Sequence, residues 1–298
     1  MNDHDAAAAP LPKNTEVKRL SSLVQAEFGA LSHQGSVRSE NEDRYLVLKL
    51  GRDQQTLITN VTESGLPLSF QEWGYLFSVA DGTSDEHAQG GTASSLALGT
   101  AVQLLLRFGR WNLRIDDRVA KEVMERTRLF YERLSDVVSE QTKGDPLMRT
   151  GTTLTTAFSA GNELFVAHVG DSRAYLWRNG KLHRLTHDQT YAQLLADAGK
   201  ISQEEVDTHH LRHVLTDALG LSEGKINVQV KRLQLEDADC VLLCTNGLTN
   251  MVSEDQIAAI LQQSLAAQET CAQLVSAALE NGGTDNVTSL VGKYSIPT

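Results

Sequence analysis

The chain has 298 residues, of which 41% are apolar and 22% are charged, as is usual for a soluble globular protein. This composition excludes wholesale disorder, a collagen-like repeat and a membrane bundle, and no run approaches the ~18 uninterrupted apolar residues of a membrane span. With 27 Lys and Arg against 38 Asp and Glu, the formal charge of −11 disfavours general binding to nucleic acid or anionic lipid.

The first 25 residues or so are rich in alanine, proline and polar side chains, which predicts a flexible tail (1–25) ahead of a single domain at 26–298. This stretch lacks a cationic start followed by a long apolar core, so no secretory signal is predicted. The three cysteines cannot form a disulfide framework, and Cys240 and Cys244 fall on one predicted strand, roughly 13 Å apart. We therefore expect a reducing cytoplasm.

The predicted strands and helices follow one another in blocks. In the first half we expect strands at Phe28–His33, Arg44–Leu50 and Gly74–Ala80, a hairpin and loop at 51–73, and helices at His87–Phe108 and Ile115–Glu140. In the second half we expect strands at Thr152–Ser159, Glu163–Val169, Arg173–Trp177 and Lys181–Leu185, short helices in 188–213, strands at Ile226–Leu233 and Cys240–Thr245, helices at Ser253–Gln263 and Gln268–Glu280, and a strand at Val287–Tyr294. Antiparallel hairpins with helices grouped in blocks predict an α+β fold rather than a doubly wound sheet.

Four clusters of acidic and amide residues fall at the ends of these strands or in turns. They are Asn41-Glu42-Asp43, Asp81-Gly82, Asn246-Gly247 and Asp285-Asn286. A strand that ends in Asp-Gly places a carboxylate and an exposed backbone carbonyl at the edge of a sheet. Mg²⁺ and Mn²⁺ prefer such oxygen ligands, several from separate segments. Each cluster alone is more typical of a turn than of a metal ligand.

The order of these clusters and the sequences around them resemble the metal-dependent Ser/Thr protein phosphatases, the protein phosphatase 2C family, in its bacterial form. The matching segments are GSVRSENEDRY (35–45), LFSVADG (76–82), GTTLTTA (151–157), ELFVAHVGDSRAYLWRNGKLHRLTHDQT (163–190), LRHVLTDALG (211–220), DCVLLCTNGLTNMV (239–252) and GGTDNVTSLV (282–291). They occur in the family's order and cover about residues 28 to 294.

The resemblance implies both a fold and a reaction. The fold is a central antiparallel β-sandwich flanked on both sides by helix pairs, an αββα arrangement with a two-metal site at one end of the sandwich. The reaction is hydrolysis of phosphoserine or phosphothreonine in phosphoproteins by a water that bridges two Mn²⁺ or Mg²⁺ ions, without a phospho-enzyme. Two cations about 3.5–4 Å apart offset the charge of the phosphate monoester and acidify the water that they share.

The resemblance also implies roles for individual residues. Asp81 would bridge the two metals, and the Gly82 carbonyl would bind one of them. Asp285 would bind the other metal, and Asp43 would act directly or through a coordinated water. Arg38 would form a fork on the substrate phosphate, a role that its position five residues before Asp43 favours over a plain surface charge. Arg38 and Asp81 are thus the predicted catalytic residues.

Three positions depart from the family pattern. Asn246 stands where an aspartate is usual. Its amide oxygen can still bind a cation, but the lost negative charge predicts weaker metal binding and a more acidic bound water. Asn250 replaces another aspartate that, with Asp171, would complete an auxiliary third metal site, and Asp171 fits a turn residue equally well. Thr83 cannot replace the usual histidine acid, and His87 is expected in the first turn of the next helix, so no general acid is assigned.

These observations predict a cytoplasmic, monomeric Mn²⁺/Mg²⁺-dependent Ser/Thr phosphatase in signal transduction, opposing a Ser/Thr kinase, with no nucleic-acid or membrane partner. The alternative from another class is a pseudophosphatase, the same fold with weakened or absent catalysis, used as a binding or regulatory module. A metal hydrolase for a different phosphoester is a third hypothesis, because fold does not fix substrate. Metal titration separates the first two hypotheses, and a panel of phosphopeptides and small phosphoesters separates the first from the third.

Overall fold

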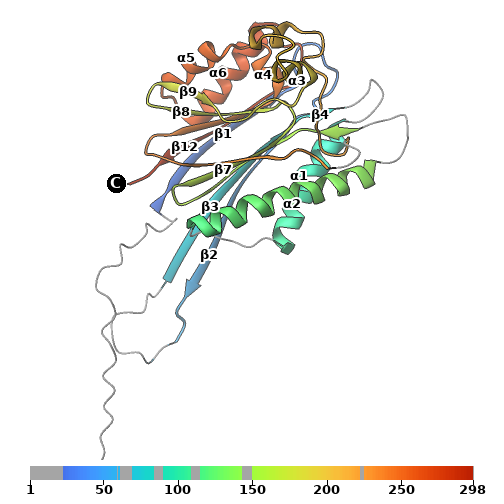
Figure 1. Ribbon diagram of the computed structural model, residues 1–298. Helices are drawn as coiled ribbons and strands as arrows, with labels where there is room; N and C mark the ends of the chain where they lie inside the picture. Colours follow the sequence, from blue (N-terminus) through green and yellow to red (C-terminus); the bar gives the residue numbers. More distant parts are fainter. Residues whose placement is uncertain are drawn as a thin grey trace, which may run out of the picture.

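Two antiparallel five-stranded sheets form the centre of the protein (Figure 1). The computed structural model describes residues 23–58, 60, 69–83, 90–108, 115–142, 150–221 and 225–297. The first sheet has the order β1 (Gln25–His33), β12 (Val287–Ser295), β11 (Cys240–Cys244), β8 (Arg173–Arg178), β9 (Lys181–Arg184). The second has the order β10 (Gln229–Gln234), β7 (Glu163–Val169), β6 (Leu154–Ala160), β3 (Ser69–Ala80), β2 (Arg44–Gln55). A short ribbon pairs β4 (Gly82–Thr83) with β5 (Gly151–Thr152).

A helix pair covers the outer face of each sheet. The helices are α1 (Gly90–Phe108) and α2 (Asp117–Thr142) on the second sheet, and α5 (Glu254–Gln262) and α6 (Ala267–Glu280) on the first. Three shorter elements, α3 (Tyr191–Asp197), the 3₁₀ helix η2 (Gln203–Thr208) and α4 (Asn246–Thr249), complete the described helices. Figure 1 shows α5 and α6 on one side of the sandwich and α1 and α2 on the other. The predicted α+β class and the αββα arrangement are confirmed.

Three hydrophobic cores separate these four layers. Strand β11 shows how the sequence builds two of them, because its side chains alternate between the faces of the sheet. Cys240, Leu242 and Cys244 pack toward α5 and α6, whereas Val241 and Leu243 pack into the space between the sheets. The third core joins the second sheet to α1 and α2. A strand buried on both faces reads as an uninterrupted apolar run, as DCVLLC does.

Local chemistry explains several element boundaries. The RNG turn between β8 and β9 places Asn179 and Gly180 at positive φ, as a tight hairpin turn requires. Helix α5 starts at a capping box in which Ser253 and Gln256 bond to each other's backbone N–H groups. Helix α4, which follows β11 directly, was not predicted, because Asn-Gly is most typical of a turn.

The predicted elements are all present, with shifted ends. Strands β2 and β3 are longer than predicted. Their antiparallel pairing begins with Arg44 opposite Ala80 and continues until Gln55 lies opposite Ser69. Strand β10 begins at Gln229 rather than at Ile226. Residues 1–22 and 61–68 lie outside the described residues, so the predicted tail and the tip of the hairpin stay predictions.

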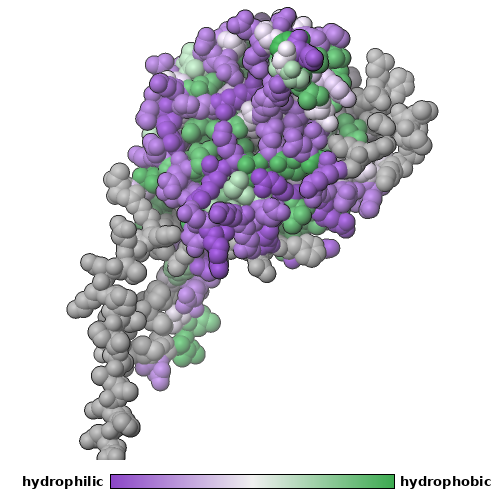
Figure 2. All heavy atoms as spheres, in the orientation of Figure 1, coloured by the Kyte–Doolittle hydropathy of each residue, from purple (hydrophilic) through white to green (hydrophobic). Residues whose placement is uncertain are grey.

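The surface and the cysteines have the following features. Hydrophilic side chains cover most of the face seen in Figure 2. No helix in the described ranges is both long and apolar enough to cross a membrane. All three cysteines are free and buried, and Cys240 and Cys244 stand at the two ends of β11, as predicted.

Candidate metal centre and active site

Strand ends from both sheets meet at one end of the sandwich. Because neighbouring strands are antiparallel, the start of β2 lies opposite the end of β3, which is followed at once by Asp81. In the other sheet, β11 ends just before Asn246, and β12 begins just after Asp285. Strand β7 ends just before Gly170 and Asp171. The fold therefore brings the predicted site residues to a common edge.

Asp43 is the most deeply buried of these carboxylates. Its Oδ2 accepts hydrogen bonds of 2.7 Å from the hydroxyls of Thr245, which directly follows β11, and Thr288, which lies in β12 of the other sheet. Its Oδ1 is buried and accepts no hydrogen bond from the described residues. Burial, opposed by these two hydroxyls, raises the pKa of Asp43 to about 7.

Asp81 is fixed through its backbone by two threonines, Thr152 at the end of β5 and Thr153 directly after it. The Asp81 N–H donates to Thr153 Oγ1 at 3.0 Å, and the Asp81 carbonyl accepts from the Thr152 hydroxyl at 2.9 Å. Burial, and after it the negative charges of Asp43, Asp171 and Asp285, holds the pKa of the Asp81 carboxyl well above its ordinary value. A cation at this position would reverse that effect.

Asp171 and Asn246 form a second group at the same edge. The Asn246 amide Nδ2 donates to Asp171 Oδ2 at 3.0 Å. Asp171 Oδ1 and Asn246 Oδ1 are buried and have no hydrogen-bond partner among the described residues. Burial raises the pKa of Asp171 to about 6, although Asn246 opposes this shift.

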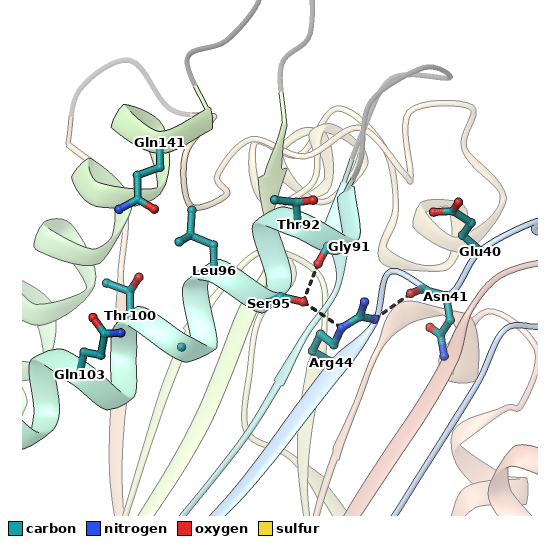
Figure 3. A pocket seen from close by; sticks show the side chains of 11 residues that line it. Glu40, Asn41, Arg44, Gly91, Thr92, Ser95, Leu96, Thr100, Gln103 and Gln141 are labelled. Carbon is teal, nitrogen blue, oxygen red and sulfur yellow. Dashed lines mark hydrogen bonds between the residues drawn. The ribbon is translucent and has the colours of Figure 1, made fainter.

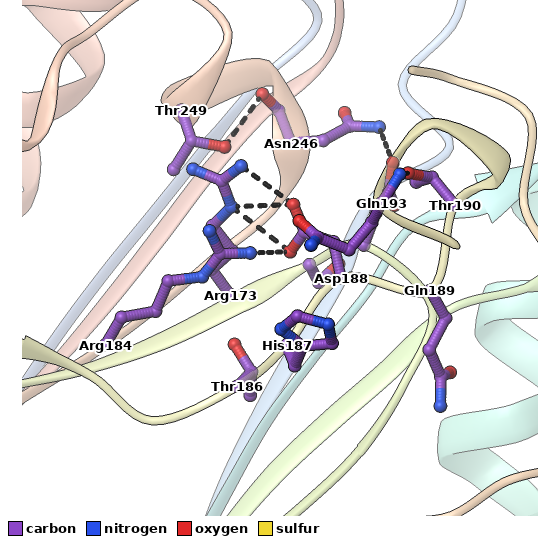
Figure 4. Close-up of polar contacts among 12 residues, drawn as sticks. Arg173, Arg184, Thr186, His187, Asp188, Gln189, Thr190, Gln193, Asn246 and Thr249 are labelled. Atoms are coloured by element: carbon purple, nitrogen blue, oxygen red, sulfur yellow. Dashed lines mark hydrogen bonds and ion pairs between the residues drawn. The ribbon is translucent and has the colours of Figure 1, made fainter. Parts of the chain in front are cut away.

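An ion pair supports this second group from behind (Figure 4). Arg173 Nη2 lies 2.7 Å from Asp188 Oδ2, and both side chains are largely buried. The neighbouring Gln189 accepts from the Gly170 N–H through its side chain at 2.8 Å. The segment that follows β9 therefore holds the loop that carries Asp171 in place.

Asp285 and Arg38 lie at the exposed rim of the site. Arg38 Nε and Nη2 contact the two Asp285 carboxylate oxygens at 2.8 and 2.9 Å. The Arg38 side chain is 52% exposed and carries further N–H donors besides those that contact Asp285. Next to them, a Cβ at Gly247 would lie 1.9 Å from the Asn286 carbonyl oxygen, so only glycine allows α4 to approach β12 this closely.

Asn286 is a positioning residue, a role that the sequence did not indicate although it placed Asn286 in one of the four clusters. Its Oδ1 accepts from the Glu42 N–H at 2.8 Å, and its Nδ2 donates to the carbonyls of Gln34 and Glu40 at 2.7 and 2.8 Å. One amide thus ties the segment that carries Arg38 and Asp43 to the start of β12. Its position directly after Asp285 was the available signal.

The oxygen atoms at this edge fit divalent metal ions. Buried oxygens of Asp43, Asp171 and Asn246, from three segments, have no described hydrogen-bond partner, and neither has the Thr83 hydroxyl, two residues after Asp81. Such atoms are costly in the absence of a cation or water. No three His, Cys, Asp or Glu side chains of the described ranges are placed to hold one ion by themselves. Carboxylates would therefore supply a minority of each ion's ligands, with amide, carbonyl and water oxygens as the rest, as Mg²⁺ prefers.

These pKa shifts predict how the stability of the metal-free protein depends on pH. Asp43 is protonated up to about pH 7 in the folded protein but only up to about pH 4 when unfolded, so the folded state is favoured at low pH. We expect its Tm to fall by about 5 °C or more from pH 5 to pH 7.5. Scanning calorimetry in EDTA measures this. Saturating Mn²⁺ should abolish the trend, and a Tm that rises over this range without metal would contradict the burial of ionisable carboxylates here.

Comparison with known proteins identifies the family. The family model for protein phosphatase 2C matches residues 66–281 of this chain. The chain belongs to the protein phosphatase 2C family. It is 30% identical over 277 residues to the serine/threonine phosphatase stp of Listeria monocytogenes, covering 90% of this chain and 95% of that protein. It is 31% identical over 265 residues to the serine/threonine protein phosphatase PstP of Mycobacterium tuberculosis, of which it spans 44% of the length.

Solved structures of protein phosphatase 2C members have the same fold. The M. tuberculosis PstP structure superposes with a TM-score of 0.70 at 29% identity, covering 90% of this chain and 98% of that one. The PstP catalytic domain in complex with two manganese ions gives a TM-score of 0.68 at 28% identity, covering 91% and 99% of the two chains. The predicted family and fold are confirmed, and the family consists of metal-dependent hydrolases.

Three predictions about departures from the protein phosphatase 2C pattern have different outcomes. Asn246 lies in the site, bonded to Asp171. Asn250 is exposed at the end of α4, and its backbone N–H bonds to the Asn246 carbonyl, so the described contacts do not join its side chain to Asp171. Thr83 follows Gly82 in β4, where the buried Gly82 pairs with Thr152, and the Thr83 hydroxyl is buried without a described hydrogen-bond partner. His87 lies outside the described residues, so the structure assigns no general acid.

Proposed function

We propose that the protein hydrolyses phosphoserine and phosphothreonine in phosphoproteins with two Mn²⁺ or Mg²⁺ ions. The observation that carries this proposal is the set of buried, unpartnered oxygens of Asp43, Asp171 and Asn246 beside the exposed Arg38 fork. When bound, the two cations supply Lewis acidity toward the phosphoryl group and lower the pKa of water to near neutrality. The relatives' names and the two manganese ions of PstP support the same activity.

The chain's own residues divide the work between metal and substrate. Asp81, between the other carboxylates, would hold both cations, with the Gly82 carbonyl on one and Asp285 on the other. Asp43 and Asn246 would complete the metal site with their free oxygens. Asp171 would hold a third ion in the auxiliary position without help from Asn250, whose side chain is exposed.

Arg38 would orient the phosphate, because a guanidinium presents parallel N–H groups to phosphate oxygens. We expect Arg38→Lys to lower kcat/KM for a phosphothreonine peptide by about 10- to 100-fold, from the loss of charge-assisted hydrogen bonds. Arg52→Lys is the matched control, since Arg52 forms a similar two-bond pair with Glu72 on the long hairpin. Equal kcat/KM values for the two variants would show that Arg38 does not bind the substrate.

A polar recess beside the site would hold the substrate residues that flank the phosphoresidue. Its volume is about 690 Å³, and it lies between the Asn41–Arg44 segment and one face of α1. Figure 3 shows Arg44 at its wall, bonded to the Asn41 carbonyl at 2.7 Å and to the Ser95 hydroxyl at 3.0 Å. The remaining lining includes the neutral polar side chains of Thr92, Thr100, Gln103 and Gln141. Such groups favour polar peptide segments over apolar ones.

A substrate panel tests the proposed function. Phosphate release is measured with Mn²⁺ on phosphothreonine and phosphoserine peptides, on phosphothreonine alone, and on small phosphoesters. We expect the peptides to give the highest kcat/KM. A preference for a non-peptide phosphoester would replace the protein substrate with that class.

The cellular setting is part of the same proposal. We infer a cytoplasmic monomer that takes part in signal transduction by reversing the action of a Ser/Thr kinase. The three free, buried cysteines are consistent with a reducing compartment. The phosphoprotein substrates would be those of the opposing kinase.

A further inference from the structure

An apolar cavity lies between the second sheet and the helices α1 and α2, away from the rim of the metal site. Its volume is about 410 Å³, within the range of about 300–1,000 Å³ that is typical of small-molecule sites. Its walls come from β2, β3, β6 and β7 on one side and from α1 and α2 on the other, among them Leu48, Leu76, Phe158, Ala101, Leu105 and Phe130.

The cavity arises because α1 covers the sheet unevenly. In its first half, Ala93 and Ala97 are fully buried against the sheet. In its second half, Leu104 and Leu105 are only partly buried, and Leu106 is 70% exposed. The partly buried second half of α1 therefore leaves apolar surface of the sheet uncovered, and Leu104 and Leu105 line the resulting space.

The polar groups inside the cavity are already satisfied. Ser78 and Thr156 bond to each other at 2.9 Å, and the Tyr131 hydroxyl donates to the Ala167 carbonyl at 3.3 Å. A site without open donors or acceptors gives water no partners and instead accepts apolar molecules. The interior therefore selects an apolar chain.

Two charged side chains line the cavity, and both are cationic. Arg126 and Arg133 of α2 line the cavity, and no acidic side chain does so. Arg133 is exposed and forms no ion pair with the described residues, while Arg126 contacts Glu122 at 3.5 Å on the helix surface. In a chain with a net charge of −11, an apolar space whose charged lining residues are both arginines, one of them without an ion pair to the described residues, favours a ligand with one negative end.

We propose that this cavity binds a single-chain anionic amphiphile of the fatty-acid class, with its chain between α1 and the second sheet and its carboxylate beside Arg133 and Arg126. The Arg133 N–H groups would pair with the carboxylate, and burial of the chain would supply most of the affinity. This ligand site shares no residue with the proposed metal centre. Its occupancy is measured without metal and without substrate, so the result does not depend on the proposed phosphatase function.

The test is titration of decanoate, below its micelle concentration, into the full chain in EDTA, followed by calorimetry and by thermal unfolding. We expect saturable binding at one site and a rise in Tm with ligand concentration. Ala101→Phe, which fills the cavity from α1, should weaken decanoate binding about tenfold or more. Leu106→Phe, five residues on and outside the cavity lining, is the matched control and should bind as the unsubstituted chain does.

A second arm tests the charged end. Arg133→Gln should weaken binding of decanoate but leave binding of decanol, which has no charge, unchanged. If Ala101→Phe does not fold, Ala101→Leu fills less of the same space and replaces it. The absence of saturable decanoate binding, or equal weakening by Ala101→Phe and Leu106→Phe, would overturn the proposal. Equal loss of decanoate and decanol binding in Arg133→Gln would overturn the role given to the carboxylate.

Discussion

Asp81→Asn is expected to reduce Mn²⁺-dependent phosphate release from a phosphothreonine peptide by about 10³-fold or more, because the several kcal/mol that a metal site contributes depend on this charge. Asp81 lies near three other carboxylates, those of Asp43, Asp171 and Asp285. Burial is the largest cause of its raised pKa, and the three negative charges raise the pKa further. An amide of the same shape keeps the packing but withdraws the charge through which the two cations would be held together.

The same substitution should stabilise the metal-free protein. Removal of one of several mutually repelling, desolvated carboxylates lowers the cost of burying the others, so the Tm in EDTA at pH 7.5 should rise. Loss of activity together with a gain in Tm distinguishes a functional charge from a structural one. Asp136→Asn, on the exposed surface of α2, is the control and should change neither property. Activity within tenfold of the unsubstituted protein would contradict the role of Asp81.

Asn246→Asp is expected to tighten Mn²⁺ binding by about 10- to 100-fold, the range seen when groups around a metal site are changed. The Asn246 Oδ1 is buried without a described partner, so a carboxylate there would present a charged oxygen to the cation. The new charge would also face Asp171, which now accepts from the Asn246 amide at 3.0 Å. We therefore expect a lower Tm in EDTA, and calorimetric Mn²⁺ titration measures the change in affinity.

Asn250→Asp is the matched comparison for this experiment. Asn250 lies one helical turn away, at the exposed end of α4. The same change of charge at this position should leave the affinity for the first two Mn²⁺ ions within about threefold of that of the unsubstituted protein, because exposed charges contribute little energy. If Asn246→Asp and Asn250→Asp change Mn²⁺ affinity equally, the position of Asn246 in the metal site is contradicted.

The sequence predicted the strands, the helices and the α+β class well because these signals are local, whereas the αββα arrangement was predicted from the family resemblance. Apolar runs such as DCVLLC, turns such as RNG and the long amphipathic helix at 115–140 each depend on neighbouring residues. The Asn-Gly after β11 misled, because Asn246 starts the short helix α4 rather than a turn. That helix depends on a close approach to Asn286, which local sequence does not encode.

The candidate site was predicted in its carboxylates but not in its supports. The family pattern named Asp43, Asp81 and Asp285, but the hydroxyls that bind Asp43 come from residues more than 200 positions away in the chain. Threonine is common in strands, so Thr245 and Thr288 carried no distinct signal. The pairing of Arg38 with Asp285 likewise joins residues 247 positions apart.

Phosphate release from a phosphothreonine peptide, with Mn²⁺ titrated from zero and EDTA as the control, tests the central claim most directly. Metal binding is followed in the same samples by calorimetry, and folding by circular dichroism. The account predicts no turnover in EDTA and turnover that rises and saturates as Mn²⁺ binds. Folded protein that binds Mn²⁺ at this site and releases no phosphate at any metal concentration would contradict it, and would identify a binding module instead of an enzyme.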